Sequence, residues 1–345
     1  MKKIHINASK SYDVLIDHNL LDHIGELLLN KLNKPCKIAI ISDSNVYPIY
    51  GIRVSENLNA SGFEVANYTF SAGESSKNAN TYIEILNFLA QHHFTRTDAV
   101  LALGGGVVGD LTGFVAATFL RGIPFIQVPT SLLAMIDSSV GGKTAIDLPT
   151  GKNLVGAFYQ PVLVICDLNT LSTLPECVFC DGCAEVIKYS VLYDENLFAH
   201  LETQGLCFDR EYVISRCVEL KANVVADDEF DKGARQMLNF GHTIGHGVEA
   251  QSHFTITHGH AVAIGMAIIT KSACKSIYDS LIAVLNKFQL PATTTFTANQ
   301  LYISALSDKK RSGDMLNLIV PKRIGECYIQ PVQVDALESI IEEGL

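Results

Sequence analysis

A buried strand that runs directly into a glycine-rich turn is the feature that most restricts the fold of this chain. Residues 98–103 are almost entirely apolar, and residues 104–110 contain the pattern G-x-G-x-x-G. Glycines let the backbone approach a pyrophosphate and leave amide groups free to bind it, and residues 111–120 can form the helix behind. Three glycines after a strand can also make a simple tight turn, so the pattern alone leaves cofactor binding open.

Strand and helix patterns alternate through the first half of the chain. Apolar runs at 37–43, 98–103 and 124–129 predict buried strands, and the apolar positions within 81–91 predict an amphipathic helix. This alternation favours a parallel α/β sheet, which binds ligands beyond the carboxyl ends of its strands. Because the glycine pattern follows a strand near residue 100 and not the first strand, we expect a nucleotide-binding fold outside the standard Rossmann family.

The second half has a different character, because its patterns are mostly helical from about Leu174 onward. Examples are 185–188, 213–226 and 261–278. A length of 345 residues also favours two domains. We therefore predict a Rossmann-like α/β nucleotide-binding domain over 1–160 and a mostly α-helical domain over 161–345.

Charge and composition exclude several classes of partner. The net charge is -10 and basic residues form no block, which argues against nucleic acid. The two lysines near the N-terminus precede no apolar segment, and Asp110 interrupts the most apolar stretch, 99–120, so no membrane partner is expected. The nine cysteines are interpreted as reduced thiols, and a cytoplasmic location is predicted.

Three cysteines form the pattern C-x-x-C-x-x-C, which can bind a metal ion or an iron–sulfur cluster. They are Cys177, Cys180 and Cys183, and no fourth cysteine follows closely. Pro175 and Glu176 indicate that a helix begins just before them. The cysteines would then share one helix face, so we favour their packing as small apolar residues.

Residues 140–144 resemble the end of a phosphate-binding P-loop. The pattern G-x-x-x-x-G-K-[ST] requires an earlier glycine where this chain has Asp137. The P-loop interpretation therefore fails, although Lys143 can still attract an anion as a simple positive charge.

Histidines are concentrated between residues 242 and 260. His242 and His246 are spaced i, i+4 and would lie on one helix face, while His258 and His260 open an apolar run. Catalytic zinc sites often combine two histidines with one carboxylate and an open position. The motif H-E-x-x-H is absent, which argues against a zinc protease, and spacing alone does not choose the carboxylate.

Four long segments resemble the dehydroquinate synthase family, and the likeness extends over nearly the whole chain. It includes a late Asp308 followed by Lys309 and Lys310. The segments are GGGVVGDLTGFVAATFLRGIPFIQVPTSLLAMIDSSVGGKTAIDLPTGKNLVGAFYQP (104–161), LPECVFCDGCAEVIKYSVL (174–192), LNFGHTIGHGVEA (238–250) and HGHAVAIGM (258–266).

The resemblance implies an enzyme of the shikimate pathway, which supplies aromatic amino acids. It would convert 3-deoxy-D-arabino-heptulosonate 7-phosphate to 3-dehydroquinate and phosphate, as a carbon–oxygen lyase. The implied cofactors are NAD and one divalent metal ion, zinc or cobalt. The resemblance also implies a homodimer in which Arg121 reaches the substrate phosphate of the neighbouring subunit.

The resemblance supplies site residues by position. Glu185, His242 and His258 would bind the metal ion, with His246 as a nearby catalytic histidine. The implied NAD contacts are Asp43, Glu74, Lys77, Gly105, Gly106, Val107, Val108, Gly109, Asp110, Thr130, Ser131, Asp137, Lys143, Lys152, Thr170 and Thr173.

Basic and amide side chains would line the substrate cavity, because the substrate carries a carboxylate and a phosphate. One of Lys309 and Lys310 would also face the anion. The implied substrate residues are Lys143, Lys152, Asn153, Lys188, Arg235 and Asn239, together with Arg121 and His246.

The chain departs from the family pattern at two places. His260 stands where many members carry glutamate, so it is not expected as a ligand but can alter metal preference. The cysteines of 177–183 are also unusual, and can bring oxidation sensitivity near Glu185. Structural roles remain open for single residues, since Asp43 can cap a helix and Asp110 can be a helix-terminal charge.

Three other functions remain as alternatives. A different sugar phosphate cyclase would make an inosose or a valiolone, and Lys152, Asn153 and Arg235 are held to favour the dehydroquinate reaction. A metal-dependent NAD polyol or glycerol dehydrogenase would have a related architecture. A non-catalytic NAD-binding regulator would bind the cofactor without releasing phosphate.

Overall fold

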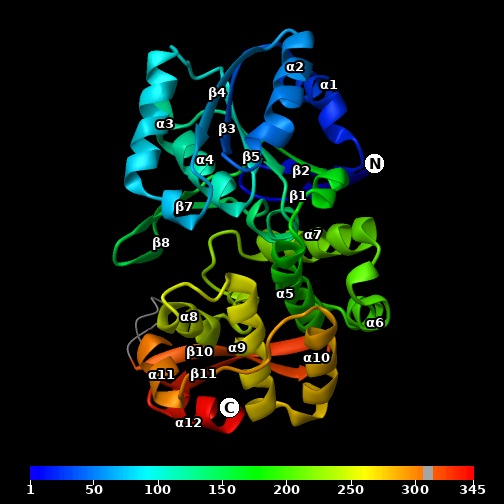
Figure 1. Cartoon of the computed structure of the whole chain (residues 1–345), viewed down its shortest axis with the longest axis vertical. Coiled ribbons are helices and arrows are strands. Elements are labelled where there is room, and N and C mark those ends of the chain that lie inside the picture. Colours follow the sequence, from blue (N-terminus) through cyan, green and yellow to red (C-terminus); the bar gives the residue numbers. More distant parts are fainter. Residues whose placement is uncertain (306–313) are drawn as a thin grey trace. The chain divides into compact units, whose positions relative to one another are not determined.

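The computed structural model describes residues 1–305 and 314–345, which fall into two compact units (Figure 1). Unit 1 comprises Met1–Leu174 and Lys221–Phe230, and unit 2 comprises Pro175–Leu220 and Asp231–Leu345. The change of unit comes after Leu174 and not near Gln160, because the strand at Leu163–Asp167 still belongs to the first sheet. The return of 221–230 to unit 1 was not anticipated either.

Unit 1 is built on a seven-stranded sheet with the order β1-β2-β9-β6-β5-β3-β4. β1 pairs antiparallel with β2, and the other neighbours are parallel. The strands expected at 37–43, 98–103 and 124–129 are confirmed as β3, β5 and β6. The seven strands are β1 Lys2–Ile6, β2 Tyr12–Asp17, β3 Lys37–Asp43, β4 Glu64–Phe70, β5 Ala99–Gly104, β6 Phe125–Pro129 and β9 Leu163–Asp167.

Helices cover both faces of this sheet (Figure 1). Successive strand residues point to opposite faces, so Ile38 and Ile40 pack with α1 and α2, whereas Ala39 and Ile41 pack with α3 and α4. The helix expected at 81–91 is confirmed as α3, and the helix expected at 111–120 begins earlier, at the third glycine of the turn, and ends at Thr118. The bounds are α1 Ile24–Leu32, α2 Ile52–Ala60, α3 Ala79–Gln91 and α4 Gly106–Thr118.

The strand order places a switch point beside β3. β4 pairs with one edge of β3 and β5 with the other, so the connections from β3 and β4 run in opposite directions across the sheet. Open parallel sheets leave a crevice at the carboxyl ends of strands at such a point. β5 ends at Gly104, so the glycine-rich turn lies at this edge, as the sequence predicted.

A hairpin that the sequence did not predict follows β6 in unit 1. β7, Lys143–Leu148, pairs antiparallel with β8, Gly151–Phe158. Asn153 has a φ of 54°, in the left-handed region, and its amide donates to Oδ1 of Asp147 at 2.7 Å. The hairpin thus carries Lys143, Lys152 and Asn153 on one short antiparallel ribbon.

Unit 2 is mostly helical, as expected, but it also contains an unpredicted hairpin of β10 and β11. The helix expected at 261–278 is divided into α9 and α10, because Cys274 between them has a φ of -147°. α7 begins in unit 2 and ends in unit 1. The elements are α5 Glu176–Tyr193, α6 Glu195–Gln204, α7 Arg210–Asp227, α8 His242–Gln251, α9 His258–Ala273, α10 Lys275–Lys287, α11 Ala298–Ala305, β10 Met315–Arg323, β11 Glu326–Gln333 and α12 Ala336–Gly344.

Two glycines bring the backbones of α8 and α9 into contact. A Cβ at Gly245 would lie 2.9 Å from the carbonyl oxygen of Ala261, and one at Gly265 would overlap the carbonyl oxygen of Gly241. Side chains at these positions would therefore push the two helices apart. Because His242 begins α8 and His258 begins α9, this contact also sets the distance between the two histidines.

The thiols and the surface show a few further features. All nine cysteines are free. Cys180 and Cys183 are buried on α5 as predicted, but Cys177 is exposed near its start, because the first turn lies at the surface.

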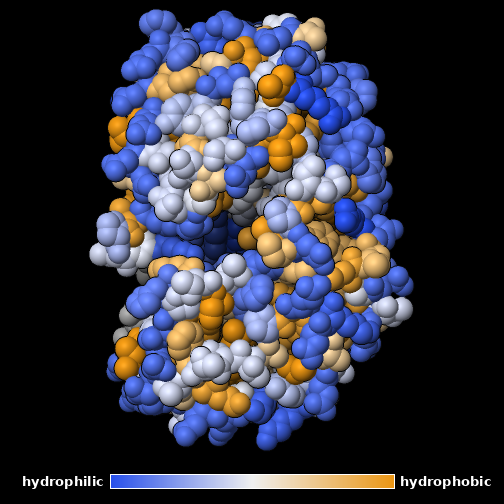
Figure 2. Space-filling view, in the orientation of Figure 1, coloured by the Kyte–Doolittle hydropathy of each residue, from blue (hydrophilic) through white to orange (hydrophobic). Residues whose placement is uncertain are grey.

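Hydrophilic residues with hydrophobic ones scattered among them cover the face shown in Figure 2. Over 1–305 and 314–345, no helix combines the length and apolarity needed to cross a membrane.

Candidate active site

Glu185 is a carboxylate held in an apolar helix. It lies in the middle of α5, where Ala184, Val186 and Ile187 are fully buried, and only 1% of Glu185 is exposed. Burying an ionised carboxylate is costly unless opposite charge or hydrogen bonds compensate. A polar partner is therefore required at this position.

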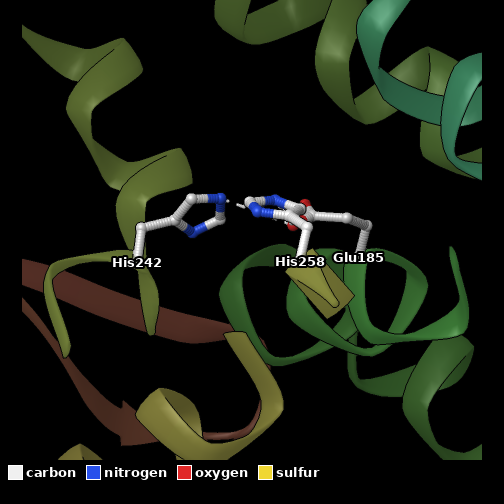
Figure 3. Close-up of side chains that lie close together, drawn as sticks. All are labelled: Glu185, His242 and His258. Atoms are coloured by element: carbon white, nitrogen blue, oxygen red, sulfur yellow. Dashed lines mark ion pairs between the residues drawn. The ribbon is translucent and has the colours of Figure 1, made fainter. Parts of the chain in front are cut away.

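Two histidines face this carboxylate from the first residues of α8 and α9 (Figure 3). Nε2 of His242 lies 3.4 Å from Oε1 of Glu185, and Nε2 of His258 lies 3.5 Å from the same oxygen. One ligand atom from each residue lies within 4.8 Å of the others. The three residues that the family resemblance implies as metal ligands are thus close together within unit 2.

The other ring nitrogen of each histidine has an acceptor. Nδ1 of His242 is 3.1 Å from the carbonyl oxygen of Phe240, and Nδ1 of His258 is 3.4 Å from Oε2 of Glu249. An imidazole that donates from Nδ1 presents the lone pair of Nε2, and metal-binding histidines are commonly held in this way. Both Nε2 atoms are therefore oriented for a ligand beside Glu185.

The charge balance of this group fits a cation. Nζ of Lys188 forms an ion pair with Oε2 of Glu185, and both histidines lie near Oε1. Burial lowers the pKa of His258, but Glu185 and Glu249 outweigh this and raise the pKa to about 10. The cluster therefore favours positive charge, and a Glu–His–His donor set suits zinc or cobalt.

Glu249 is a functional candidate that the sequence analysis missed. Its side chain is 4% exposed, and it forms a second possible ligand group with His246 and His258. The ring centroid of His246 lies 5.5 Å from that of His242 and 6.3 Å from that of His258. The signal was present in the spacing, because residues 242, 246 and 249 follow the i, i+4, i+7 pattern of one helix face.

Unit 2 also holds the expected cationic residues Lys188 and Arg235, both almost fully buried. Lys188 lies one turn after Glu185 on α5, and Arg235 lies in a short 3-10 helix, Ala234–Asn239, that precedes α8. Asn239 ends this helix just before His242. Buried cations in an acidic protein offer strong sites for a carboxylate or a phosphate.

Most of the residues implied as NAD contacts lie around the carboxyl edge of the sheet in unit 1. Asp43 ends β3, Gly105 and Gly106 follow β5, and Thr130 and Ser131 follow β6. Gly105 is the N-cap of α4, so free amides of a helix N-terminus face this edge, where an anion is favoured. Val107, Val108, Gly109 and Asp110 continue along the first turns of α4, and Thr170 and Thr173 follow β9.

A buried lysine joins several of these residues. Nζ of Lys77 lies 2.6 Å from Oδ2 of Asp110, 2.6 Å from Oδ1 of Asn153 and 4.0 Å from Oε1 of Glu74. Burial raises the pKa of Asp110, although Lys77 opposes this. The resemblance assigns Asn153 to the substrate and the other three to NAD, whereas the structure places all four together.

Other expected residues have local partners that sequence did not predict. Oδ1 of Asp43 accepts from the amides of Asn45 and Val46, so this carboxylate holds the turn after β3 and does not cap a helix. Asp137 forms an ion pair with Lys221, a lysine of α7 that the sequence analysis missed and that no local spacing signals. Arg121 has a φ of 68°, in a strained turn after α4. Lys309 and Lys310 lie outside the described residues.

Comparisons with known proteins identify the family of the chain. A family model described as 3-dehydroquinate synthase N-terminal matches residues 67–181, and one described as 3-dehydroquinate synthase C-terminal matches 182–311. The chain belongs to the 3-dehydroquinate synthase family. A curated 3-dehydroquinate synthase of Clostridium acetobutylicum is 44% identical over 346 residues, covering 96% of this chain and 97% of that protein.

Two solved structures of other synthases share the fold. A 2-deoxy-scyllo-inosose synthase, solved with carbaglucose-6-phosphate, NAD+ and Co2+, has a TM-score of 0.88 at 26% identity and covers 100% of both chains. A 2-epi-5-epi-valiolone synthase from Streptomyces hygroscopicus, solved with NAD+ and Zn2+, has a TM-score of 0.88 at 25% identity, covering 99% of this chain and 98% of that chain.

Proposed function

We propose that this chain is a carbon–oxygen lyase that converts 3-deoxy-D-arabino-heptulosonate 7-phosphate to 3-dehydroquinate and phosphate in the shikimate pathway. The observation that carries the proposal is the convergence of Nε2 of His242 and Nε2 of His258 on the buried carboxylate of Glu185. Membership of the family and 44% identity to a curated synthase support this reaction over the inosose and valiolone alternatives.

NAD and one zinc or cobalt ion are the proposed cofactors. Support comes from the Glu–His–His cluster in unit 2, from the sheet switch point in unit 1, and from the cofactors of the two related cyclases. When bound, NAD would accept a hydride from the substrate alcohol and later return it. The cation would lower the pKa of that alcohol and polarise the resulting ketone.

The residues of the chain would bind and orient the substrate. Lys188 and Arg235 are buried cations whose charge can compensate the substrate carboxylate or phosphate. A ketone acidifies the neighbouring C–H bond, so phosphate can leave by elimination with the substrate correctly held. Orientation then supplies much of the rate, which fits a site rich in lysine, asparagine and histidine. We assign the substrate to Lys143, Lys152, Asn153, Lys188, Arg235, Asn239 and His246.

Phosphate release is the decisive test. With zinc or cobalt and catalytic NAD, heptulosonate 7-phosphate should release phosphate without net NADH, and a chelator should stop the release. Release from glucose 6-phosphate or sedoheptulose 7-phosphate, but not from the heptulosonate, would show a different cyclase. NADH formed in step with product would show a polyol dehydrogenase, and NAD binding without phosphate release would favour a regulator.

We further propose a homodimer in the cytoplasm, in which Arg121 reaches the neighbouring active site. Leu120 is 40% exposed beside Arg121, and the free thiols are in keeping with a reducing compartment. Mixing Arg121→Ala with Glu185→Gln subunits should restore activity, because one site of each mixed dimer keeps both residues. An inactive mixture, with subunit exchange demonstrated, would mean that Arg121 acts in its own subunit.

A further inference from the structure

The first turn of α9 has an unusual cap. Its N-cap residue, Thr257, makes no side-chain capping hydrogen bond to the helix. The acceptor comes instead from another helix, because Oδ1 of Asp181 on α5 lies 3.0 Å from the backbone N of His260. A capping side chain normally accepts from the second or third amide of its own helix. Here a residue of α5 performs that role for α9.

Side chains strengthen this contact. The hydroxyl of Thr257 donates to Oδ1 of Asp181, and Nδ1 of His260 lies 2.9 Å from the same oxygen. Burial raises the pKa of Asp181, but these hydrogen bonds and those from the backbone of α9 outweigh it and lower the pKa. A Cβ at Gly259 would overlap the carbonyl oxygen of Asp181, so the two helix backbones also touch here.

The capped turn contains a proposed metal ligand. His258 is the first residue of α9, and Glu185 is one turn after Asp181 on α5. Asp181 therefore ties the backbone around His258 to the helix that carries Glu185, whose Oε1 lies 3.5 Å from Nε2 of His258. Without this cap, the amide of His260 would lose the acceptor that joins the first turn of α9 to α5.

We infer that Asp181 is a positioning residue that caps α9 from α5 and so holds His258 against Glu185, with His260 completing the contact. This inference rests on the metal site of the proposed function. It also gives a role to His260, whose amide and Nδ1 both contact Oδ1 of Asp181. A glutamate at 260 in this chain would place a second carboxylate beside Asp181.

The test is Co2+ affinity of the full chain, measured by the visible spectrum of the bound ion in competition with a chelator. Asp181→Ala should weaken Co2+ binding by about 10- to 100-fold, the usual effect of losing a residue that orients a ligand. Asp181→Asn keeps an acceptor oxygen and should bind Co2+ nearly as well as the unaltered chain. His260→Glu should weaken binding and remains informative if Asp181→Ala does not fold.

Asp194→Ala is the matched control, because Asp194 also caps a helix of unit 2 and accepts from the amide of Leu197 at 3.0 Å. It should lower thermal stability and leave Co2+ affinity unchanged. The inference is overturned if Asp181→Ala and His260→Glu behave like this control. If the unaltered chain binds no Co2+, the proposed metal site itself is wrong, so the two failures are distinguishable.

Discussion

The two units gather their polar residues in different ways. In unit 1, the ends of parallel strands β3, β5 and β6 bring residues distant in sequence to one edge of the sheet. In unit 2, α5, α8 and α9 must approach closely before Glu185, His242 and His258 can meet, and glycines at 245, 259 and 265 make room for this. A sheet thus forms its site by topology, whereas a helical unit forms its site by packing.

This comparison predicts that small changes are more damaging in unit 2. A Cβ at Gly105 would meet Oγ of Ser131 at 3.4 Å, an ordinary contact, whereas one at Gly265 would overlap backbone. Gly105 in unit 1 has open space beside it, whereas Gly245 and Gly265 in unit 2 let another helix approach.

The largest effect is expected from Glu185→Gln. Losing the negative charge between two imidazoles should reduce Co2+ affinity and phosphate release by more than about 100-fold, since residues that only orient ligands already contribute 10- to 100-fold. Chelator competition and phosphate release measure the two effects. If Co2+ affinity did not change, Glu185 would not be a metal ligand, and the proposed metal site in unit 2 would be wrong.

Glu249→Gln should have the next largest effect, because it weakens the acceptor of Nδ1 of His258 without removing a ligand. We expect Co2+ binding to weaken about tenfold, with a changed visible spectrum of the bound ion. Glu219→Gln, a change of the same kind at a more exposed site on α7, is the control. Equal Co2+ affinities for the two variants would contradict the role given to Glu249.

Gly265→Ala tests the packing half of the comparison. Forcing a methyl group between α8 and α9 should lower the free energy of unfolding by about 1–3 kcal/mol and weaken Co2+ binding. Gly151→Ala, which would meet only the side chain of Leu154 at 3.3 Å, is the control. If Gly265→Ala is as stable as the control and binds Co2+ with unchanged affinity, helix packing does not form the site of unit 2.

Gly105→Ala should give the smallest effect on folding. Its methyl group has room, so we expect the unfolding free energy to change by less than about 1 kcal/mol. The same methyl group would lie where a pyrophosphate would approach the N-terminus of α4. NAD affinity, measured by calorimetry, should fall about tenfold, or 1.4 kcal/mol. A stable variant with normal NAD affinity would place the cofactor elsewhere.

The sequence predicted unit 1 better than unit 2 for a physical reason. β5 is buried along its whole length, so its apolar run and the glycines after it are visible without tertiary information. The histidines were also visible, because i, i+4 spacing depends on one helix alone. Asp181, Glu185 and Lys188 follow i, i+4, i+7 on α5, but this spacing alone does not mark a metal ligand, so only the family resemblance identified Glu185.

Features that depend on contacts between distant elements were missed. The ion pair of Asp137 with Lys221 and the capping of α9 by Asp181 each join residues far apart in sequence. The hairpin of β10 and β11 has an irregular burial pattern and contains Pro321, which weakens its strand signal. Glu249 was different, because its spacing from His242 and His246 was available.

The return of 221–230 to unit 1 has a consequence for synthesis on the ribosome. Domains usually fold as units from the N-terminus while the chain is being made. Unit 1 cannot do so at Leu174, because Lys221 pairs with Asp137 and Glu229 accepts from Ser9 at 2.7 Å. Its completion must wait until α7 has emerged, so the first unit to begin is finished only after part of the second has been translated.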